Sequence, residues 1–396
     1  MKGRKHLPSG WAKELVGNLF DVQLGKMLNE KAKEGEQHPY LANFNVRWGK
    51  FDLERLNSMA FSEREQKKYT LHYGDLLVCE GGEIGRCAVW KINRSGIYYQ
   101  KALHRIRSKN EISSTEYFYF YMQYLASKRL LLKLVGETSI AHLTREKLLG
   151  LTIPLPPLPE QKAIADLLAT WDEAIEKTKR LIQEKERRFK RLLRELISEP
   201  RNTRKDAEWK KVKLDDLFGK DIIVEKGKVL SKKAIAEGDI PVVAGGQSYA
   251  YFTNVSTHDV HTVTVSASGA YAGYVWFHDY PIWASDCNVL YAVNGSTAFL
   301  YFALKAIQSQ IFSLQSGGAQ PHVYSKDLKL LTIPWPSDKA QQQIANILFS
   351  ATKEINLLKQ IAEKYKIQKR SLMQKMLTGK WRVKPEIVNQ YMGSQL

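Results

Sequence analysis

The strongest constraint on the fold of this chain is an internal repeat. Residues 151–158 read LTIPLPPL, and residues 331–338 read LTIPWPSD, 180 positions later. The register then continues without a gap, so that Gln161 aligns with Gln341 and Ile175 with Ile355. A repeat at a fixed offset indicates two copies of one structural unit, and the rest of the chain has to be interpreted around it.

Each copy continues with an apolar residue at every third or fourth position. Counted in alternating steps of four and three, eight of ten positions from Ile164 and nine of ten from Ile344 are apolar. Lys, Arg, Glu and Gln fill most of the positions between them. This spacing is typical of a coiled-coil seam. A single stripe would suit an ordinary amphipathic core helix, but two matching copies in one chain favour two long helices that pair with each other.

The segments ahead of these helices differ greatly in sequence but share an order of elements. Each contains a strand, a glycine-rich turn and a second strand, at residues 74–90 and 261–277, and then an aromatic-rich helical stretch, at 114–125 and 296–307. A basic polar linker, 201–213, separates the halves. We therefore expect an α+β fold with globular domains at 1–150 and 201–330, long helices within 151–200 and 331–380, and a tail at 381–396.

Charge and cysteine content narrow the class of protein. The 396 residues include 60 Lys and Arg against 41 Asp and Glu, for a formal net charge of +19, while 44% hydrophobic residues exclude a disordered polycation. Such a surplus favours a nucleic-acid partner, with a generally solvated basic surface as the alternative. The three cysteines show no CxxC spacing, and no apolar run is long enough to cross a membrane. These features favour a cytoplasmic protein that does not bind membranes.

Motifs for catalysis are missing from the sequence. There is no dinucleotide-binding GxGxxG after a strand, no P-loop, no HExxH, and no [DN]PP[YFW] of the kind that holds a flipped base. The pair His258 and His261 leads into a strand-like run, and the carboxylates Glu80 and Glu83 flank the glycines of a turn. We therefore expect no catalytic residue and no metal site in this chain.

Together these features resemble the specificity subunits of type I restriction-modification enzymes. The most specific part is LTIPLPPLPEQKAIADLLATWDEAI at 151–175, whose proline-rich start and Glu160-Gln161 pair are typical of that family. The second copy, LTIPWPSDKAQQQIANIL at 331–348, matches less completely because Ala340 replaces the usual acidic residue. The resemblance implies that the globular domains are target-recognition domains and that the two spacer helices pack antiparallel.

The resemblance also implies a function. The chain would be the non-catalytic DNA-recognition subunit of the complex, and each domain would read one half of a two-part duplex target through the major groove. Two modification subunits would bind it and carry S-adenosylmethionine, and restriction subunits could join with ATP and magnesium, so that this chain itself holds no cofactor. Two alternatives stay open: a coiled-coil adaptor whose basic surface binds RNA or an acidic partner, and the recognition part of a fused restriction-methylation enzyme.

Candidate DNA contacts are basic, polar and aromatic residues on the glycine-rich turns and the strands beside them. Lys and Arg would contact phosphates, while a few side chains would read base edges. For every candidate, a solvated charge or a packed aromatic ring is the alternative. The candidates are Gly82, Arg86, Lys101, Arg105 and Arg107 in the first domain, and Lys226, Lys228, Ser268, Tyr271, Tyr274, Gln320 and His322 in the second.

A second group of candidates lies on the long helices, where we expect contacts with the other helix or with another subunit. These residues are Glu160, Gln161, Ile164, Leu168, Trp171 and Ile175 in the first copy, and Gln341, Ile344, Leu348 and Ile355 in the second.

Overall fold

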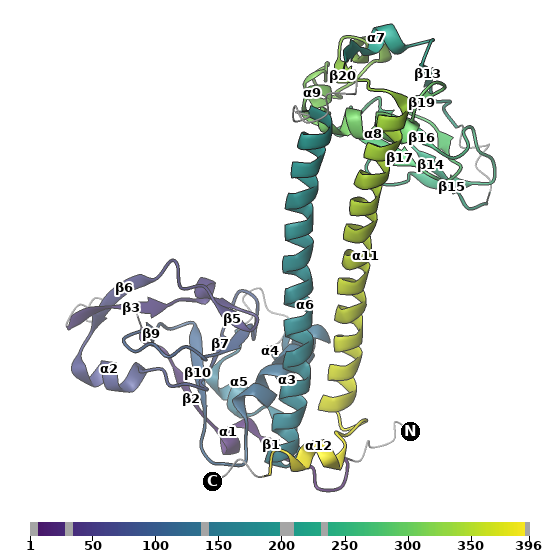
Figure 1. The fold of residues 1–396 in the computed structure, drawn as a ribbon. Coiled ribbons are helices and arrows are strands. Elements are labelled where there is room, and N and C mark those ends of the chain that lie inside the picture. The colour runs from purple at the N-terminus through teal and green to yellow at the C-terminus, as the bar shows by residue number, and fades with distance from the viewer. Residues whose placement is uncertain (1–6, 28–34, 136–141, 199–209, 231–236, 393–396) are drawn as a thin grey trace. The chain divides into compact units, whose positions relative to one another are not determined.

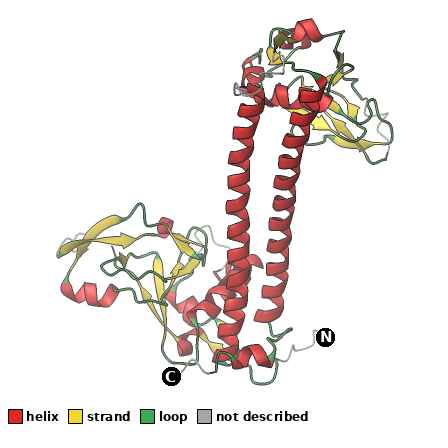
Figure 2. Cartoon of the chain, in the orientation of Figure 1, coloured by secondary structure: helices red, strands yellow, loops and turns green. Residues whose placement is uncertain are grey.

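The computed structural model describes residues 7–27, 35–135, 142–198, 210–230 and 237–392 (Figure 1). The chain forms two compact units, the first made of Met1–Lys177 and Ile361–Leu396 and the second of Thr178–Gln360. Both units contribute to the two long helices, α6 (Leu158–Leu193) and α11 (Asp338–Leu377). The fold is α+β, as the sequence predicts, and Figure 2 shows the strands in the parts of the chain outside these helices.

The first unit contains a four-stranded and a three-stranded sheet. The larger has the order β2-β10-β7-β8 and the smaller the order β6-β3-β9. In the smaller sheet, β3 pairs antiparallel with β6 and parallel with β9. A hairpin, β4-β5, lies between β3 and β6 in sequence. The strands are β2 (Phe20–Leu24), β3 (Glu36–Leu41), β4 (Val46–Arg47), β5 (Lys50–Phe51), β6 (Asn57–Phe61), β7 (Leu76–Cys79), β8 (Cys87–Val89), β9 (Tyr98–Tyr99) and β10 (Leu103–Ser108).

The second unit repeats the two sheets strand for strand, without the hairpin among its described residues. Its larger sheet has the order β13-β19-β16-β17, and its smaller sheet the order β15-β14-β18. Again the middle strand of the smaller sheet pairs antiparallel on one side and parallel on the other. The repeat therefore includes the globular parts, where the two sequences have diverged. The strands are β13 (Ile222–Lys226), β14 (Ile240–Val243), β15 (Tyr251–Thr253), β16 (Thr262–Ser266), β17 (Val275–His278), β18 (Trp283–Ala284) and β19 (Cys287–Ala292).

The proline-rich segments form short strands instead of helix. In the first unit β11 (Thr152–Leu155) pairs antiparallel with β1 (Ala12–Leu15), and in the second β20 (Thr332–Pro334) pairs with β12 (Lys211–Lys213). Proline fixes its own φ and disfavours helix in the residue before it, which explains the extended chain at these places. Each long helix begins only after this strand.

A short helix packs on the larger sheet of each unit. The aromatic-rich helices α3 (Thr115–Ser127) and α8 (Thr297–Ala306) start in the same way, because the hydroxyls of Ser114 and Ser296 accept a hydrogen bond from the backbone N–H three residues later. This is the favoured N-cap arrangement. The others are α1 (Val16–Leu19), α2 (Glu63–Tyr69), α4 (Leu130–Val135), α5 (Arg145–Leu149), α7 (Leu214–Leu217), α9 (Gln308–Ser313), α10 (Ser325–Leu328) and α12 (Pro385–Asn389), with a 3-10 turn at Asn43–Asn45 and a π-helical turn at Arg194–Ser198.

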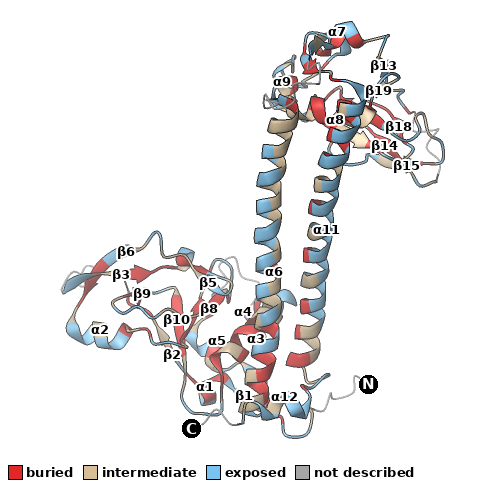
Figure 3. Cartoon of the chain, viewed as in Figure 1, coloured by how far each residue is buried: buried red, intermediate tan, exposed pale blue. Residues whose placement is uncertain are grey.

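The long helices pair along the seam that the sequence predicts. All twenty seam positions, the last of the first set lying in the π-helical turn after α6, are buried or half-buried, whereas most positions between them are exposed (Figure 3). In the first unit Trp171 and Tyr365 pack edge to face, with 5.6 Å between ring centroids. In the second unit Lys185 lies 2.6 Å from Glu354. The helices run antiparallel, since the start of α6 shares a core with the end of α11 in the first unit, and the reverse holds in the second.

Candidate functional site

Each globular domain is joined to its long helix by a buried glutamine. In the first unit Gln161 Oε1 accepts a hydrogen bond from the backbone N–H of Ser114 at 2.9 Å, and its Nε2 donates to the carbonyl of Pro156. In the second unit Gln341 bonds in the same way to Ser296, at 2.9 Å, and to Pro336. Neither glutamine side chain is accessible to solvent. These residues fix the start of each helix to the domain that precedes it.

Glu160 joins the two ends of the first unit. It accepts hydrogen bonds from the indole of Trp11 at 3.1 Å and from the guanidinium of Arg382 at 2.6 Å. The hydrogen bond to Glu160 raises the pKa of Arg382. Ala340 stands at the matching place in the second copy, so this contact is specific to the first unit.

The ten residues predicted at a helix or subunit interface are all buried or half-buried within the chain. Trp171 contacts Tyr365 of the other long helix, in line with that expectation. Ile164 and Leu168 belong to the core of the first unit, and Ile344 and Leu348 to that of the second. These residues pack within the chain, and their contact with another subunit stays a prediction.

The two glycine-rich turns are built by the same set of backbone hydrogen bonds. In the first unit the N–H of Glu80 donates to Ala102, and the carbonyl of Glu80 accepts from Leu143. In the second unit Ala267 makes the matching bonds with Asp286 and Val323. Gly85 and Gly273 close the two turns, each with a positive φ that favours glycine. The backbone of the two turns is therefore held in an equivalent way in the two units.

Different side chains surround this shared frame. In the first unit Arg86 donates to the side chain and the carbonyl of Asn43, both at 2.9 Å, and lies 3.4 Å from Glu83. The predicted Gly82 occupies the tip with a φ of 72°, and Trp48 donates to Glu83 at 2.6 Å. The structure therefore brings Gly82 and Arg86 together, with Arg86 held by neighbours.

The second turn gathers four of the predicted residues. Ser268 donates to Asp286, and Gln320 Nε2 lies 3.4 Å from the Ser268 hydroxyl. Ser268 and His322 form an isolated β-bridge, and Tyr271 is exposed on the same turn. Tyr274, by contrast, is half-buried beneath Lys305, whose ammonium lies 4.5 Å from the ring centroid. Its ring packs within the unit.

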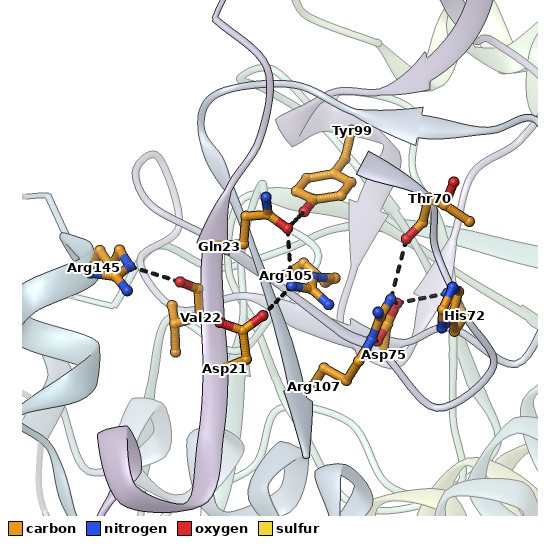
Figure 4. A network of polar contacts seen from close by, with 10 residues as sticks. All are labelled: Asp21, Val22, Gln23, Thr70, His72, Asp75, Tyr99, Arg105, Arg107 and Arg145. Atoms are coloured by element: carbon orange, nitrogen blue, oxygen red, sulfur yellow. Dashed lines mark hydrogen bonds and ion pairs between the residues drawn. The ribbon is translucent and has the colours of Figure 1, made fainter. Parts of the chain in front are cut away.

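Arg105 and Arg107 lie on β10, the strand beside the first turn, and both are engaged in ion pairs. Figure 4 shows Arg105 between Asp21 and Gln23, hydrogen-bonded to both, with only 4% of the residue exposed. Arg107 makes a bidentate ion pair with Asp75, 2.7 Å in each bond, and this hydrogen bonding raises its pKa. Sequence alone could not show these ion pairs. They hold the two side chains against Asp21 and Asp75 of the same unit.

Lys101, Lys226 and Lys228 remain exposed cations. Lys101 precedes β10, and its neighbour Ala102 accepts the hydrogen bond that holds the first turn. Lys226 ends β13, and Lys228 follows Gly227, whose N–H donates to Cys287. A Cβ at Gly227 would lie 2.1 Å from the carbonyl oxygen of Ser285, so only glycine fits at this position. These lysines have the exposure that phosphate contacts require.

Three residues beside the turns are not among those predicted from the sequence. Asn43 and Gly245 lie in segments that the two halves do not share, and Asp286 is a lone carboxylate in a charged chain. The Gly245-Gly246 dipeptide is a turn signal that could have drawn attention to its segment. Nothing in the sequence points to Asn43 or Asp286.

Other chemistry is limited in the part of the chain that the structure describes. No cluster of three or more His, Cys, Asp or Glu side chains there could hold a metal ion. No helix among the described residues is long and apolar enough to span a membrane. All three cysteines are buried, and burial raises the pKa of Cys79 to about 11 and that of Cys287 to about 12.

Comparison with known proteins identifies the family. The sequence profile of the type I restriction modification DNA specificity domain matches residues 8–187 and again residues 206–366. The chain belongs to this family. It carries two DNA specificity domains, one in each half, in agreement with the duplicated topology.

Relatives match this specificity protein over nearly its whole length. The type I restriction enzyme MjaVIII specificity subunit of Methanocaldococcus jannaschii is 22% identical over 430 residues, which cover 96% of this chain and 94% of the relative. A relative from the same organism, named for the MjaX specificity subunit, is 23% identical over 408 residues, covering 96% and 95%. The crystal structure of the type I restriction-modification S subunit from M. genitalium has the same fold, with a TM-score of 0.68, 19% identity, and coverage of 95% and 98%.

Proposed function

We propose that this chain is the DNA-recognition subunit of a type I restriction-modification complex, and that each unit recognises one half of a two-part duplex target. The observation that carries the proposal is the duplication itself. Two units share one topology and one turn geometry, but they place different side chains around that turn. Two such surfaces can read two different short sequences.

Affinity and specificity come from different residues in this proposal. The exposed cations Lys101, Lys226 and Lys228 contact phosphates and orient the protein, and these contacts carry no sequence information. The major groove is faced by side chains of both turns. These are Gln320, His322 and Tyr271 on the second turn, and Arg86 with its neighbours on the first. Amide and imidazole groups can hydrogen-bond to base edges there.

The chemistry of the complex belongs to other subunits. Two modification subunits supply S-adenosylmethionine-dependent methylation, and restriction subunits supply ATP- and magnesium-dependent cleavage. We place their binding on the outer faces of the long helices, where several large apolar side chains are solvent-exposed instead of joining the seam. These are Leu167 and Leu181 on α6, and Ile347, Leu357, Ile361 and Ile367 on α11.

An electrophoretic mobility-shift assay on the complex with its modification subunit tests the proposal. We expect sequence-selective duplex binding that weakens steeply with salt, and an excess of structured RNA should not displace the DNA. Alanine at both Lys226 and Lys228 should weaken binding to every sequence and lower the salt slope by about 2, one for each phosphate contact. Lys190, an exposed lysine of α6, is the control. Equal affinity for all duplexes, or tight S-adenosylmethionine binding by this chain alone, would contradict the proposal.

A further inference from the structure

One segment differs between the two units more than the strands on either side of it. In the first unit residues 42–56 join β3 to β6, and in the second residues 244–250 join β14 to β15. The two segments start at equivalent places. The carbonyl of Leu41 accepts a hydrogen bond from the N–H of Gln100, and the carbonyl of Val243 accepts one from the N–H of Ser285. We call these segments the linkers of the small sheets.

Both linkers touch the glycine-rich turn at the same point. Asn43, two residues after Leu41, donates from its side chain to the carbonyl of Gly81 at 2.9 Å. Gly245, two residues after Val243, lies so near the turn that a Cβ would be 2.4 Å from the carbonyl oxygen of Ser268. The linker and the turn therefore form one continuous surface in each unit.

Beyond this point the linkers have nothing in common. The first is long and contains a 3-10 turn and the hairpin β4-β5, whereas the second is the short loop AGGQSYA. The sheets on either side keep the same strand order in both units. Two domains that recognise different half-sites need such a variable loop, held in place by sheets of the same topology.

The second linker is anchored at both ends and free in the middle. The ring of Tyr249 stacks on Trp276 at 5.1 Å with an interplanar angle of 13°, and its hydroxyl lies 2.5 Å from that of Tyr280. Gln247 lies between this anchor and Gly245. Its side chain is exposed and makes no hydrogen bond to any residue that the structure describes. An amide in this state can form the bidentate pair with adenine N6 and N7.

We propose that the two linkers are specificity-determining elements and that Gln247 reads an adenine edge in the half-site bound by the second unit. The inference rests on the DNA-recognition function proposed above. In the first unit the hairpin places Arg47 and Lys50 directly opposite each other, both exposed and without an ion pair among the described residues. Like charges directly opposite each other destabilise a strand pair, and a DNA phosphate between them would relieve this repulsion. We therefore place a phosphate contact here, which would hold the rest of the first linker against the bases.

Methylation-site sequencing of the full chain with its modification subunit tests the inference. Gln247→Ala should leave one half-site unchanged and lower the preference at one A·T pair of the other by about tenfold or more. Gln247→Glu should move the preference at that pair towards cytosine, whose N4 amino group donates to a carboxylate. Gln342→Ala, at an exposed glutamine on α11 of the same unit, should match the wild type.

The outcomes separate this inference from the function on which it rests. A two-part wild-type target that both Gln247 variants leave intact at every position would overturn the role of Gln247 and keep the proposed function. A wild-type protein without any two-part target would overturn the proposed function itself. Because Gln247 is exposed, all variants should keep the wild-type Tm, so a change of target is not a folding defect.

Discussion

Lys369 of α11 lies with its ammonium 2.6 Å from the carboxylate of Asp172 on α6. Its side chain is only 11% exposed, at a seam position where the heptad pattern calls for an apolar residue. Burial lowers the pKa of Lys369, and the neighbouring Asp172 opposes that change. The ammonium also donates to Gln123 of α3 at 3.0 Å, so the pair connects both long helices with the first recognition domain.

Removing the carboxylate of this pair should cost more stability than removing the ammonium. Asp172→Ala leaves a buried ammonium without its counter-charge, so we expect a loss of about 3 kcal/mol. Lys369→Met keeps the volume and leaves behind only Asp172, whose side chain is 39% exposed and stays solvated, so stability should change by less than about 1 kcal/mol. Urea unfolding of the full chain measures both. Equal losses in the two variants would show that the ion pair itself, and not the uncompensated charge, decides stability.

The two buried glutamines should be among the most sensitive positions of the long helices. Gln161→Leu leaves the Ser114 N–H and two carbonyls without a buried partner, so we expect a loss of about 2–4 kcal/mol. Gln341→Leu should behave alike in the second unit. Gln183→Leu, at an exposed glutamine of α6, is the control and should have little effect. Thermal unfolding followed by circular dichroism measures the differences, and a neutral Gln161→Leu would refute this role.

Charge at the seam should separate the long helices. Ile175 and Ile355 are 6% and 7% exposed, so aspartate at both positions buries carboxylates without partners and should cost about 3 kcal/mol or more. Leu181→Asp makes the same kind of change at a side chain that is 43% exposed, and should change the free energy of unfolding of the isolated chain very little. Calorimetry of the three proteins provides the comparison. Recovery of a wild-type two-part DNA target by the double variant would show that the paired helices are not needed for recognition.

The sequence was informative about the scaffold for a physical reason. Helix pairing depends on a periodic pattern along one segment, so the seam from Ile164 and its copy from Ile344 could be read directly. The strand-turn-strand order of 74–90 and 261–277 is equally local. Each of these predictions is confirmed by the structure.

The sequence was less informative about the candidate site, because the site depends on contacts between distant segments. Arg105 resembles any exposed arginine in sequence, yet Asp21, 84 positions away, neutralises it. Gln161 was predicted at an interface with a helix or subunit, but its partner is the start of α3 in its own domain. The nearness of Gly245 to Ser268 follows only from the arrangement of the sheets.

Acid should weaken the second unit through His278. This residue is fully buried between Thr264 and Tyr280, and burial lowers its pKa from 6.5 to about 4. The unfolded chain takes up a proton near pH 6.5, whereas the folded chain resists it until about pH 4. The neutral imidazole therefore makes its full contribution to the free energy of unfolding above pH 6.5. This contribution, about 3 kcal/mol, is lost as the pH falls towards 4.

Urea unfolding of the wild type and of His278→Gln between pH 7.5 and 4 isolates this effect. The variant lacks the titrating group, so the difference in stability between the two proteins should shrink as the pH falls. Parallel curves would show that His278 does not titrate abnormally. The NMR shift of the imidazole gives its pKa directly.

Methylation-site sequencing of DNA exposed to the wild-type chain and its modification subunit tests the central claim most directly. Two units of one topology with different turn surfaces should yield a target of two unlike blocks separated by a constant number of unspecified base pairs. A single continuous block, or methylation without sequence preference, would contradict the account.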